Sequence, residues 1–331
     1  MAECSVRLVR HTKERSTKEY EMNFPENRVK WDHEVLVIGG GPAGLGAAMS
    51  LGRLRRSVLV CDDYRPRNLA AAHMYNFASH EGLSPLEWRK KARIDIERYD
   101  TVHFFEGAVA SVVKVHGGFE ATLSSKSAVK VKKVILAYGV EDRLPPIPGM
   151  QELWGKSLFH CPFCHAYEHR GERMGVFANG AAAMRFVPMI SGVTSDITLF
   201  THGKSELTSE QTEMFRCRKV RIIEHPVEKL IHDGNALQAV IAGGKRFELD
   251  AMLGGGPMPF KMKSDVGESL GCEKNEKGLY KVDEWNRTSV PGVYAGGDSM
   301  TMQHAVVGAL STGQWAGATA AQDLLTEAFS G

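Results

Sequence analysis

Short apolar runs alternate with amphipathic segments along most of this chain. Residues 34–38 have the pattern of a buried strand, and they lead through a glycine-rich turn into a helix pattern that continues to residue 54. Residues 57–61 form the next apolar run, and residues 106–123 alternate apolar and polar positions around a Gly-Gly pair, which predicts a β-meander. The strand–helix–strand order predicts an α/β fold with a parallel sheet.

The same order returns on a smaller scale in the second half of the chain. Residues 174–177 lead into a second helix pattern, and residues 197–200 form another apolar run. A proline-rich connector at residues 143–149 separates the two halves, because such a segment suits neither a helix nor a central strand. Near the end of the chain, an apolar strand precedes a long helix pattern rich in small residues, at 306–325.

The predicted organisation is therefore one dinucleotide-binding domain with a smaller one inserted into it. We assign residues 34–146 and 264–331 to the first domain and residues 147–263 to the insert. Residues 1–33 mix charges of both signs without an apolar core segment, so we expect an N-terminal extension that is a surface arm or partly disordered, with a strap for a dimer as the alternative.

Composition excludes several classes of protein. The chain has 331 residues, 43% of them hydrophobic and 24% charged, with a formal net charge of +2. These values are ordinary for a globular protein and favour neither a nucleic acid nor a membrane as partner. Six cysteines in a chain this long do not form a disulfide scaffold, so we expect a reducing, cytoplasmic setting.

The first glycine-rich turn has the spacing of a dinucleotide site. Gly39 allows a tight turn, Gly41 lets the backbone approach a pyrophosphate, and Gly44 lets the helix pack against the strand. Asp62 follows the next strand about 20 residues later, where a carboxylate can accept hydrogen bonds from a ribose. The alternative is a glycine-rich turn without a ligand. The motif does not distinguish a flavin from a nicotinamide dinucleotide.

A Cys-x-x-Cys pair is the clearest candidate for chemistry. Cys161 and Cys164 stand two residues apart, between His160 and His165, and could cycle between dithiol and disulfide while a histidine stabilises a thiolate. The alternatives are a zinc half-site or two unrelated buried cysteines. Zinc would need a second ligand pair, and the other cysteines are scattered singly. They are Cys4, Cys61, Cys217 and Cys272.

Three further segments resemble the two-dinucleotide flavoproteins. The strand at 293–298 ends in Gly-Gly-Asp, residues 303–305 read Gln-His-Ala, and residues 137–139 read Ala-Tyr-Gly. The resemblance implies FAD as cofactor, with the loop of residues 68–76 wrapping the flavin. The implied cofactor-binding residues are Gly39, Gly41, Pro42, Ala43, Gly44, Asp62, Asn68, Asn76, Val109, Ala137, Gly139, Gly297, Asp298, Gln303, His304 and Ala305. No metal ligands are predicted.

A Cys-x-x-Cys within an inserted dinucleotide domain resembles the low-molecular-weight thioredoxin reductases. That family binds NADPH through a Gly-x-Gly-x-x-Ala turn and a basic His-Arg-Arg cluster. Here the turn at 178–183 keeps only its middle glycine, Gly180, and residues 201–203 read Thr-His-Gly. We expect that this domain no longer binds NADPH, because paired arginines are hard to replace at a phosphate site. The alternative is that Lys204 or Arg185 supplies the charge.

This pattern resembles a branch of the family, the dithiol oxidases that close the disulfides of gliotoxin and holomycin. The similarity rests on Tyr-Arg-Pro-Arg-Asn at 64–68, where two residues are inserted, on Ala-Ala-His-Met-Tyr-Asn at 71–76, and on 160–168. It implies a small dithiol as substrate, O₂ as acceptor, hydrogen peroxide as product, and a homodimer. The alternatives are a disulfide reductase driven by NADPH or another donor, and a flavin redox sensor.

The resemblance also implies roles for individual residues. Cys161 would form the mixed disulfide with the substrate, and Cys164 would be the flavin-facing partner. As our own hypothesis, His160 and His165 are candidates for general base and thiolate stabiliser, with Asn68 orienting His160; the alternative for each histidine is a purely structural role. The basic stretch at 89–93 is expected to be a solvated helix face.

Overall fold

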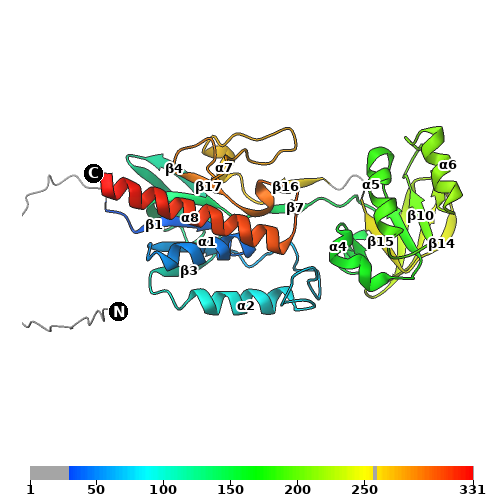
Figure 1. Ribbon diagram of the computed structural model, residues 1–331, viewed down its shortest axis with the longest axis horizontal. Coiled ribbons are helices and arrows are strands. Elements are labelled where there is room, and N and C mark those ends of the chain that lie inside the picture. The colour runs from blue at the N-terminus through cyan, green and yellow to red at the C-terminus, as the bar shows by residue number, and fades with distance from the viewer. Residues whose placement is uncertain (1–29, 256–258, 331) are drawn as a thin grey trace, which may run out of the picture. The chain divides into compact units, whose positions relative to one another are not determined.

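A computed structural model describes residues 30–255 and 259–330. In these residues the chain forms two Rossmann-like sheets, and helices connect their parallel strands (Figure 1). The α/β prediction is confirmed. Of the predicted extension, residues 1–29 lie outside the described residues. Its last residue, His33, already belongs to the first strand.

The first sheet has a parallel centre and an antiparallel meander at one side. The strand order is β3-β2-β1-β6-β5-β4, and β17 pairs with β6 in parallel. The parallel strands are β1 (His33–Ile38), β2 (Val58–Asp62), β3 (Val102–Glu106), β6 (Ala128–Leu136) and β17 (Val293–Ala295). The predicted meander consists of β4 (Val109–Val115) and β5 (Gly118–Leu123), which pair antiparallel.

The central strand β1 is buried on both faces. Val35 and Val37 point into one apolar core, which includes residues of α1 (Pro42–Arg53). Leu36 and Ile38 point into a second core on the opposite face. This two-sided burial explains why β1 reads as a continuous apolar run rather than an alternating one.

Helices α1 and α8 (Val306–Ser330) cross in close contact (Figure 1). A Cβ added at Gly313 would lie 1.9 Å from the carbonyl oxygen of Ala43, so only glycine permits this approach. The small residues of α8 therefore bring its beginning close to the glycine turn that opens α1.

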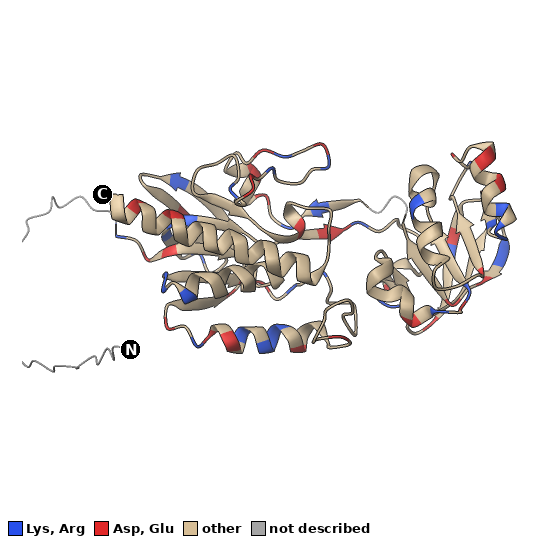
Figure 2. Cartoon of the chain, in the orientation of Figure 1, with Lys and Arg blue, Asp and Glu red and all other residues tan. Residues whose placement is uncertain are grey.

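Helix α2 (Pro85–Ile96) begins after Ser84, whose hydroxyl accepts a hydrogen bond from the Glu87 amide at 3.4 Å. Basic and acidic residues are mixed along α2, whereas α8 carries charges only towards its C-terminal end (Figure 2). One side of α2 is buried, and Trp88 and Ile96 lie on it.

The second sheet repeats the parallel arrangement with shorter strands, in the order β11-β10-β9-β15-β8. A three-stranded antiparallel sheet, β12-β13-β14, shares its apolar core. The helices of this part of the chain include α5 (Gly180–Ile190) and α6 (Ser209–Cys217). The strands are β8 (Leu158–Phe159), β9 (Met174–Phe177), β10 (Ile197–Phe200), β11 (Arg221–Ile223), β12 (Val227–Asp233), β13 (Ala236–Ala242), β14 (Lys245–Glu248) and β15 (Ala251–Gly254).

Two short antiparallel strands, β7 (Val140–Asp142) and β16 (Phe260–Met262), pair where the chain passes between the two sheets. The domain boundaries at 146/147 and 263/264 lie a few residues beyond this ribbon and stay predictions. No helix in the described ranges is long and apolar enough to cross a membrane. The remaining short helices are α3 (Met150–Leu153), α4 (Pro162–His165), η1 (Ala166–His169), α7 (Val266–Ser269) and η2 (Gly297–Ser299).

Candidate active site

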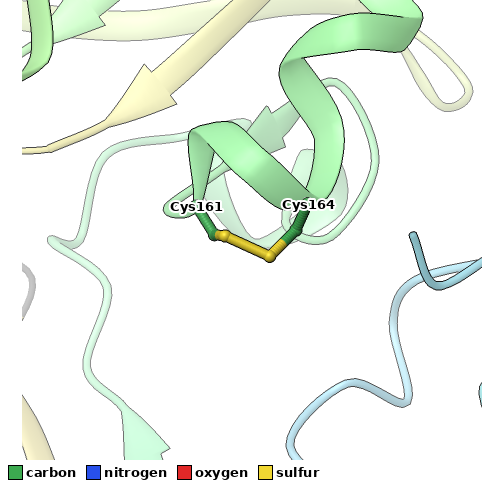
Figure 3. Close-up of a disulfide and its surroundings, with 2 residues drawn as sticks. All are labelled: Cys161 and Cys164. Carbon is green, nitrogen blue, oxygen red and sulfur yellow. A yellow bond between two sulfur atoms is a disulfide. The ribbon is translucent and has the colours of Figure 1, made fainter. Parts of the chain in front are cut away.

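The two cysteines of the Cys-x-x-Cys pair are joined by a disulfide across the first turn of α4 (Figure 3). Cys161 is the N-cap of this helix and Pro162 its first residue, a position where the missing amide hydrogen of proline costs nothing. The Cys164 amide donates a hydrogen bond to the Cys161 carbonyl oxygen at 3.2 Å, so the turn itself brings the sulfurs together. The bonded pair favours the redox interpretation over a zinc half-site.

A cavity of about 550 Å³ lies at the carboxyl ends of β1, β2 and β6. Ligands of doubly wound sheets bind at this edge. Cys164, His160 and His165 line the cavity, whereas Cys161 does not. Most predicted cofactor-binding residues line it as well, and they are Gly39, Gly41, Pro42, Ala43, Asp62, Asn68, Asn76, Val109, Ala137, Gly139, Gly297, Asp298, His304 and Ala305.

Two predicted cofactor-binding residues do not line the cavity, Gly44 and Gln303. Gly44 is buried inside the turn, where an added Cβ would lie 1.7 Å from the Gly39 carbonyl oxygen. Gln303 is exposed in the segment before α8. Gly44 therefore acts through packing, as its place in the motif implies.

The turn before α1 leaves room for a dinucleotide. A Cβ added at Gly41 would meet no atom within 4 Å, so the backbone faces open space at the start of α1. Gly39 has φ +109°, and a Cβ there would lie 2.6 Å from the Ala137 carbonyl oxygen. The buried Nε2 of His304 has no hydrogen-bond partner within the described part of the chain. An open helix N-terminus and an unpaired polar atom on the same cavity fit the pyrophosphate and polar groups of FAD.

Arg67 and Arg89 line the cavity, although neither was predicted as a site residue. Arg67 bridges two acids, with its Nε 2.8 Å from Asp142 Oδ2 and its Nη1 2.8 Å from Asp298 Oδ2. Arg89 is paired with Asp62 and is only 8% exposed, so the expectation that residues 89–93 form a solvated face is wrong for this residue. The sequence contains only a weak signal for the burial of Arg89, because the pattern of a charged helix does not distinguish an arginine that points to solvent from one that pairs with a buried acid.

The electrostatics around Arg67 depend on burial and charge together. Burial opposes ionisation of Asp142 and is the largest single effect, but the hydrogen bonds and the positive charge of Arg67, together with smaller effects of His160 and His304, outweigh it and hold the pKa of Asp142 below its ordinary value. The positive charge of Arg67 in turn acts on His160. Arg67 thus connects the acid before the proline-rich connector with Asp298, the acid of the Gly-Asp motif.

His160 and His165 are both held neutral. Burial, reinforced by the charge of Arg67, lowers the pKa of His160 to about 4. Burial also lowers the pKa of His165 to about 4, with a smaller effect of His169. Both rings therefore have a free nitrogen lone pair that can accept a proton, but a pKa of about 4 makes each a weak base in the disulfide form of the site.

Each histidine ring is oriented by an aromatic neighbour rather than by an amide. His160 stacks on Trp154 with ring centroids 5.5 Å apart, and His165 stacks on Phe159 at 5.4 Å. Neither ring nitrogen of His165 has a hydrogen-bond partner among residues 30–255 and 259–330. The expected contact from Asn68 to His160 is likewise not formed between these described residues. Asn68 instead lines the cavity.

The second turn, before α5, has side chains of the chain itself around its helix N-terminus. The Asn179 side chain caps the helix, accepting a hydrogen bond from the Gly180 amide at 2.9 Å. The Glu206 carboxylate lies over Gly180, since an added Cβ there would be 2.8 Å from its Oε2. The helix N-terminus that would receive a pyrophosphate already has a carboxylate beside it.

A dinucleotide-type cavity beside a redox disulfide, with a second and smaller dinucleotide-type sheet carrying that disulfide, defines a disulfide oxidoreductase of the two-dinucleotide class. A family model described as pyridine nucleotide-disulphide oxidoreductase matches residues 33–322. The chain therefore belongs to this family, whose members are flavin-dependent. The predicted resemblance to thioredoxin reductase-like proteins is confirmed.

Known proteins with similar sequences and structures lead to the same class. The chain is 33% identical over 306 residues to thioredoxin reductase tcpT of Claviceps purpurea (strain 20.1), covering 89% of this chain and 95% of the relative. The crystal structure of HlmI superposes with a TM-score of 0.83 at 31% identity, covering 90% of this chain and 94% of HlmI. A putative thioredoxin reductase TrxB from Bacillus anthracis gives a TM-score of 0.85 at 26% identity, covering 90% and 100%.

Proposed function

We propose that this protein is an FAD-dependent dithiol oxidase, which converts a small dithiol and O₂ into a cyclic disulfide and hydrogen peroxide. The observation that carries the proposal is that Cys164 lines the cavity of the first glycine turn while Cys161 does not. One sulfur can then face a cofactor while the other meets the substrate. The second turn does not fit a nicotinamide, so the electrons would come from thiols.

The cysteine pair would perform the first half of the reaction by thiol–disulfide exchange. A substrate thiolate attacks Cys161 Sγ, breaks the Cys161–Cys164 bond and releases the Cys164 thiolate. The second substrate thiolate attacks the substrate sulfur of this mixed disulfide and releases the Cys161 thiolate. The substrate leaves as a cyclic disulfide, and its two electrons remain on the cysteine pair.

Two protons have to leave the substrate thiols during this exchange. His160 and His165 lie next to the cysteines in sequence, line the same cavity and are neutral. We assign them as acceptors of these protons, each held in place by an aromatic ring.

The residues that would hold FAD are those of the glycine turn, Asp62, Asp298 and His304. When bound, FAD would take two electrons from the cysteine pair, restore the disulfide and pass the electrons to O₂. The predicted homodimer and cytoplasmic location stay predictions.

Anaerobic titration of the flavin-loaded protein tests the proposal. A small dithiol such as dithiothreitol should bleach the flavin absorbance, and admission of air should restore it with one peroxide formed per dithiol. NADPH alone should leave the flavin oxidised. Prompt bleaching by NADPH would favour a reductase, and failure of every dithiol to turn over would favour a redox sensor.

Cysteine variants separate the two sulfurs. Cys164→Ser should abolish bleaching by dithiols, because the pair can no longer pass electrons onward. Cys217→Ser is the matched control, since Cys217 is an exposed free cysteine on α6 and should be without effect. Undiminished bleaching in Cys164→Ser would contradict the assignment of Cys164 as the flavin-facing sulfur.

A further inference from the structure

The start of α5 is the place where a dinucleotide would bind in the second sheet. It follows β9, at the carboxyl edge of a parallel sheet, and its first residue Gly180 has φ +49°. In a dinucleotide-binding domain the pyrophosphate sits against this helix N-terminus, and a basic group after the next strand meets a 2′-phosphate.

The Asn179 side chain closes this position by joining two segments. Its Oδ1 accepts hydrogen bonds from the amides of Gly180 and Glu206, both at 2.9 Å. Its Nδ2 donates to the Lys204 carbonyl oxygen, also at 2.9 Å. The side chain of Asn179 therefore connects the loop after β10 to the turn before α5 through hydrogen bonds.

The same loop brings a negative charge to the helix N-terminus. A Cβ added at Gly180 would lie 2.8 Å from Glu206 Oε2 and 3.4 Å from Glu206 Cβ. Carboxylates are favoured at this end of a helix for the reason that phosphates are. The negative charge of Glu206, next to this turn, would repel a phosphate that approached.

His202 and Ser205 of this loop make hydrogen bonds of their own, whereas Lys204 is an exposed basic residue of the same loop, so the alternative that it supplies the charge stays open. The ring of His202 is turned to accept a hydrogen bond from the Val227 amide at 2.9 Å, and the Ser205 amide donates to Glu224 Oε1 at 2.8 Å. The guanidinium of Arg185 lies over the Phe186 ring, 5.2 Å from its centroid. The alternative that Arg185 replaces the missing arginine pair is not supported by this position.

We propose that Asn179 and Glu206 form an internal plug that excludes NADPH and NADH from the inserted part of the chain. Loss of the family's glycines and arginines would only weaken binding, whereas a carboxylate next to the helix N-terminus opposes it. This inference goes beyond dithiol oxidation, because it names the residues that prevent nicotinamide nucleotides from feeding the same disulfide.

The plug can be tested by removing its charge. In the flavin-loaded protein, NADPH binding is measured by quenching of NADPH fluorescence, with Glu206→Arg and the double variant Asn179→Gly, Glu206→Arg. Glu276→Arg is the matched control, because Glu276 is exposed and lies outside the insert, while the net charge changes equally. Retention of flavin and an unchanged midpoint of thermal unfolding establish that each variant is folded.

Wild type and Glu276→Arg should not saturate below about 1 mM NADPH, and Glu206→Arg should bind at least about tenfold more tightly. The double variant should bind more tightly still. Saturable wild-type binding equal to that of Glu206→Arg would overturn the plug, and so would equally weak binding in all four proteins. These outcomes are independent of whether a dithiol is oxidised, so failure of the proposed activity would leave the plug standing.

Discussion

Replacing Arg67 with methionine should destabilise the protein strongly. Arg67 pairs with Asp142 and Asp298, and the side chains of Arg67 and Asp142 are only 16% and 9% exposed. Methionine preserves most of the side-chain volume but leaves two acids in the cavity wall without a cation. Removing one partner of a buried pair costs about 3–5 kcal/mol, because the remaining charge is buried and uncompensated.

Urea denaturation with FAD in excess measures this cost as the free energy of unfolding. The matched control is Arg173→Met, because Arg173 and Asp250 form a similar two-pronged pair with side chains 43% and 34% exposed. A solvent-exposed pair of this kind contributes far less than a buried one, because water screens it. A loss in Arg67→Met no larger than in Arg173→Met would refute the electrostatic argument.

The pH dependence supplies an independent check. In wild type, Arg67 holds the pKa of Asp142 low, so the stability from this pair is present at neutral pH and is lost as the pH falls through that lowered pKa. In Arg67→Met the buried carboxyl can become neutral on mild acidification. The difference in unfolding free energy between the two proteins should therefore be larger at pH 8 than at pH 5.

Two further predictions concern the histidines and the glycine turn. His160 and His165 have pKa values of about 4 in the folded protein, below the ordinary 6.5. Between pH 6.5 and pH 4 these histidines are therefore protonated in the unfolded chain but neutral in the folded chain. The free energy of unfolding should fall by roughly 3 kcal/mol per histidine from pH 6.5 to 4, and an unchanged profile in His165→Phe would count against this account. Gly41→Ala should leave the stability of the cofactor-free protein unchanged, because the added Cβ would meet no other atom of the protein. It should weaken FAD binding at least about tenfold, because the same Cβ would project into the space that the pyrophosphate needs. Gly44→Ala should instead prevent folding, since its Cβ would lie 1.7 Å from the Gly39 carbonyl oxygen; equal behaviour of the two alanine variants in thermal melts would contradict both roles.

Local patterns were sufficient for the fold and for the disulfide. The apolar runs at β1 and β9 are each followed by a glycine-containing turn. This pattern predicts a strand that leads into a helix, because secondary structure depends mainly on the hydrophobic periodicity of neighbouring residues. The Cys-x-x-Cys spacing likewise places two sulfurs on one helical turn. These features could be predicted since each depends on residues that are close in the sequence.

The environment of the site depended on contacts between distant segments. Arg67 meets Asp298 across 231 positions of the chain, and Glu206 reaches the helix start at Gly180 through the loop after the next strand. The lowered pKa of His160 arises from burial by segments that the local pattern does not identify. Sequence alone therefore determined which groups can carry the chemistry. Only the tertiary structure decided which charges face them, because electrostatic interactions depend on distance and burial in space rather than on separation along the chain.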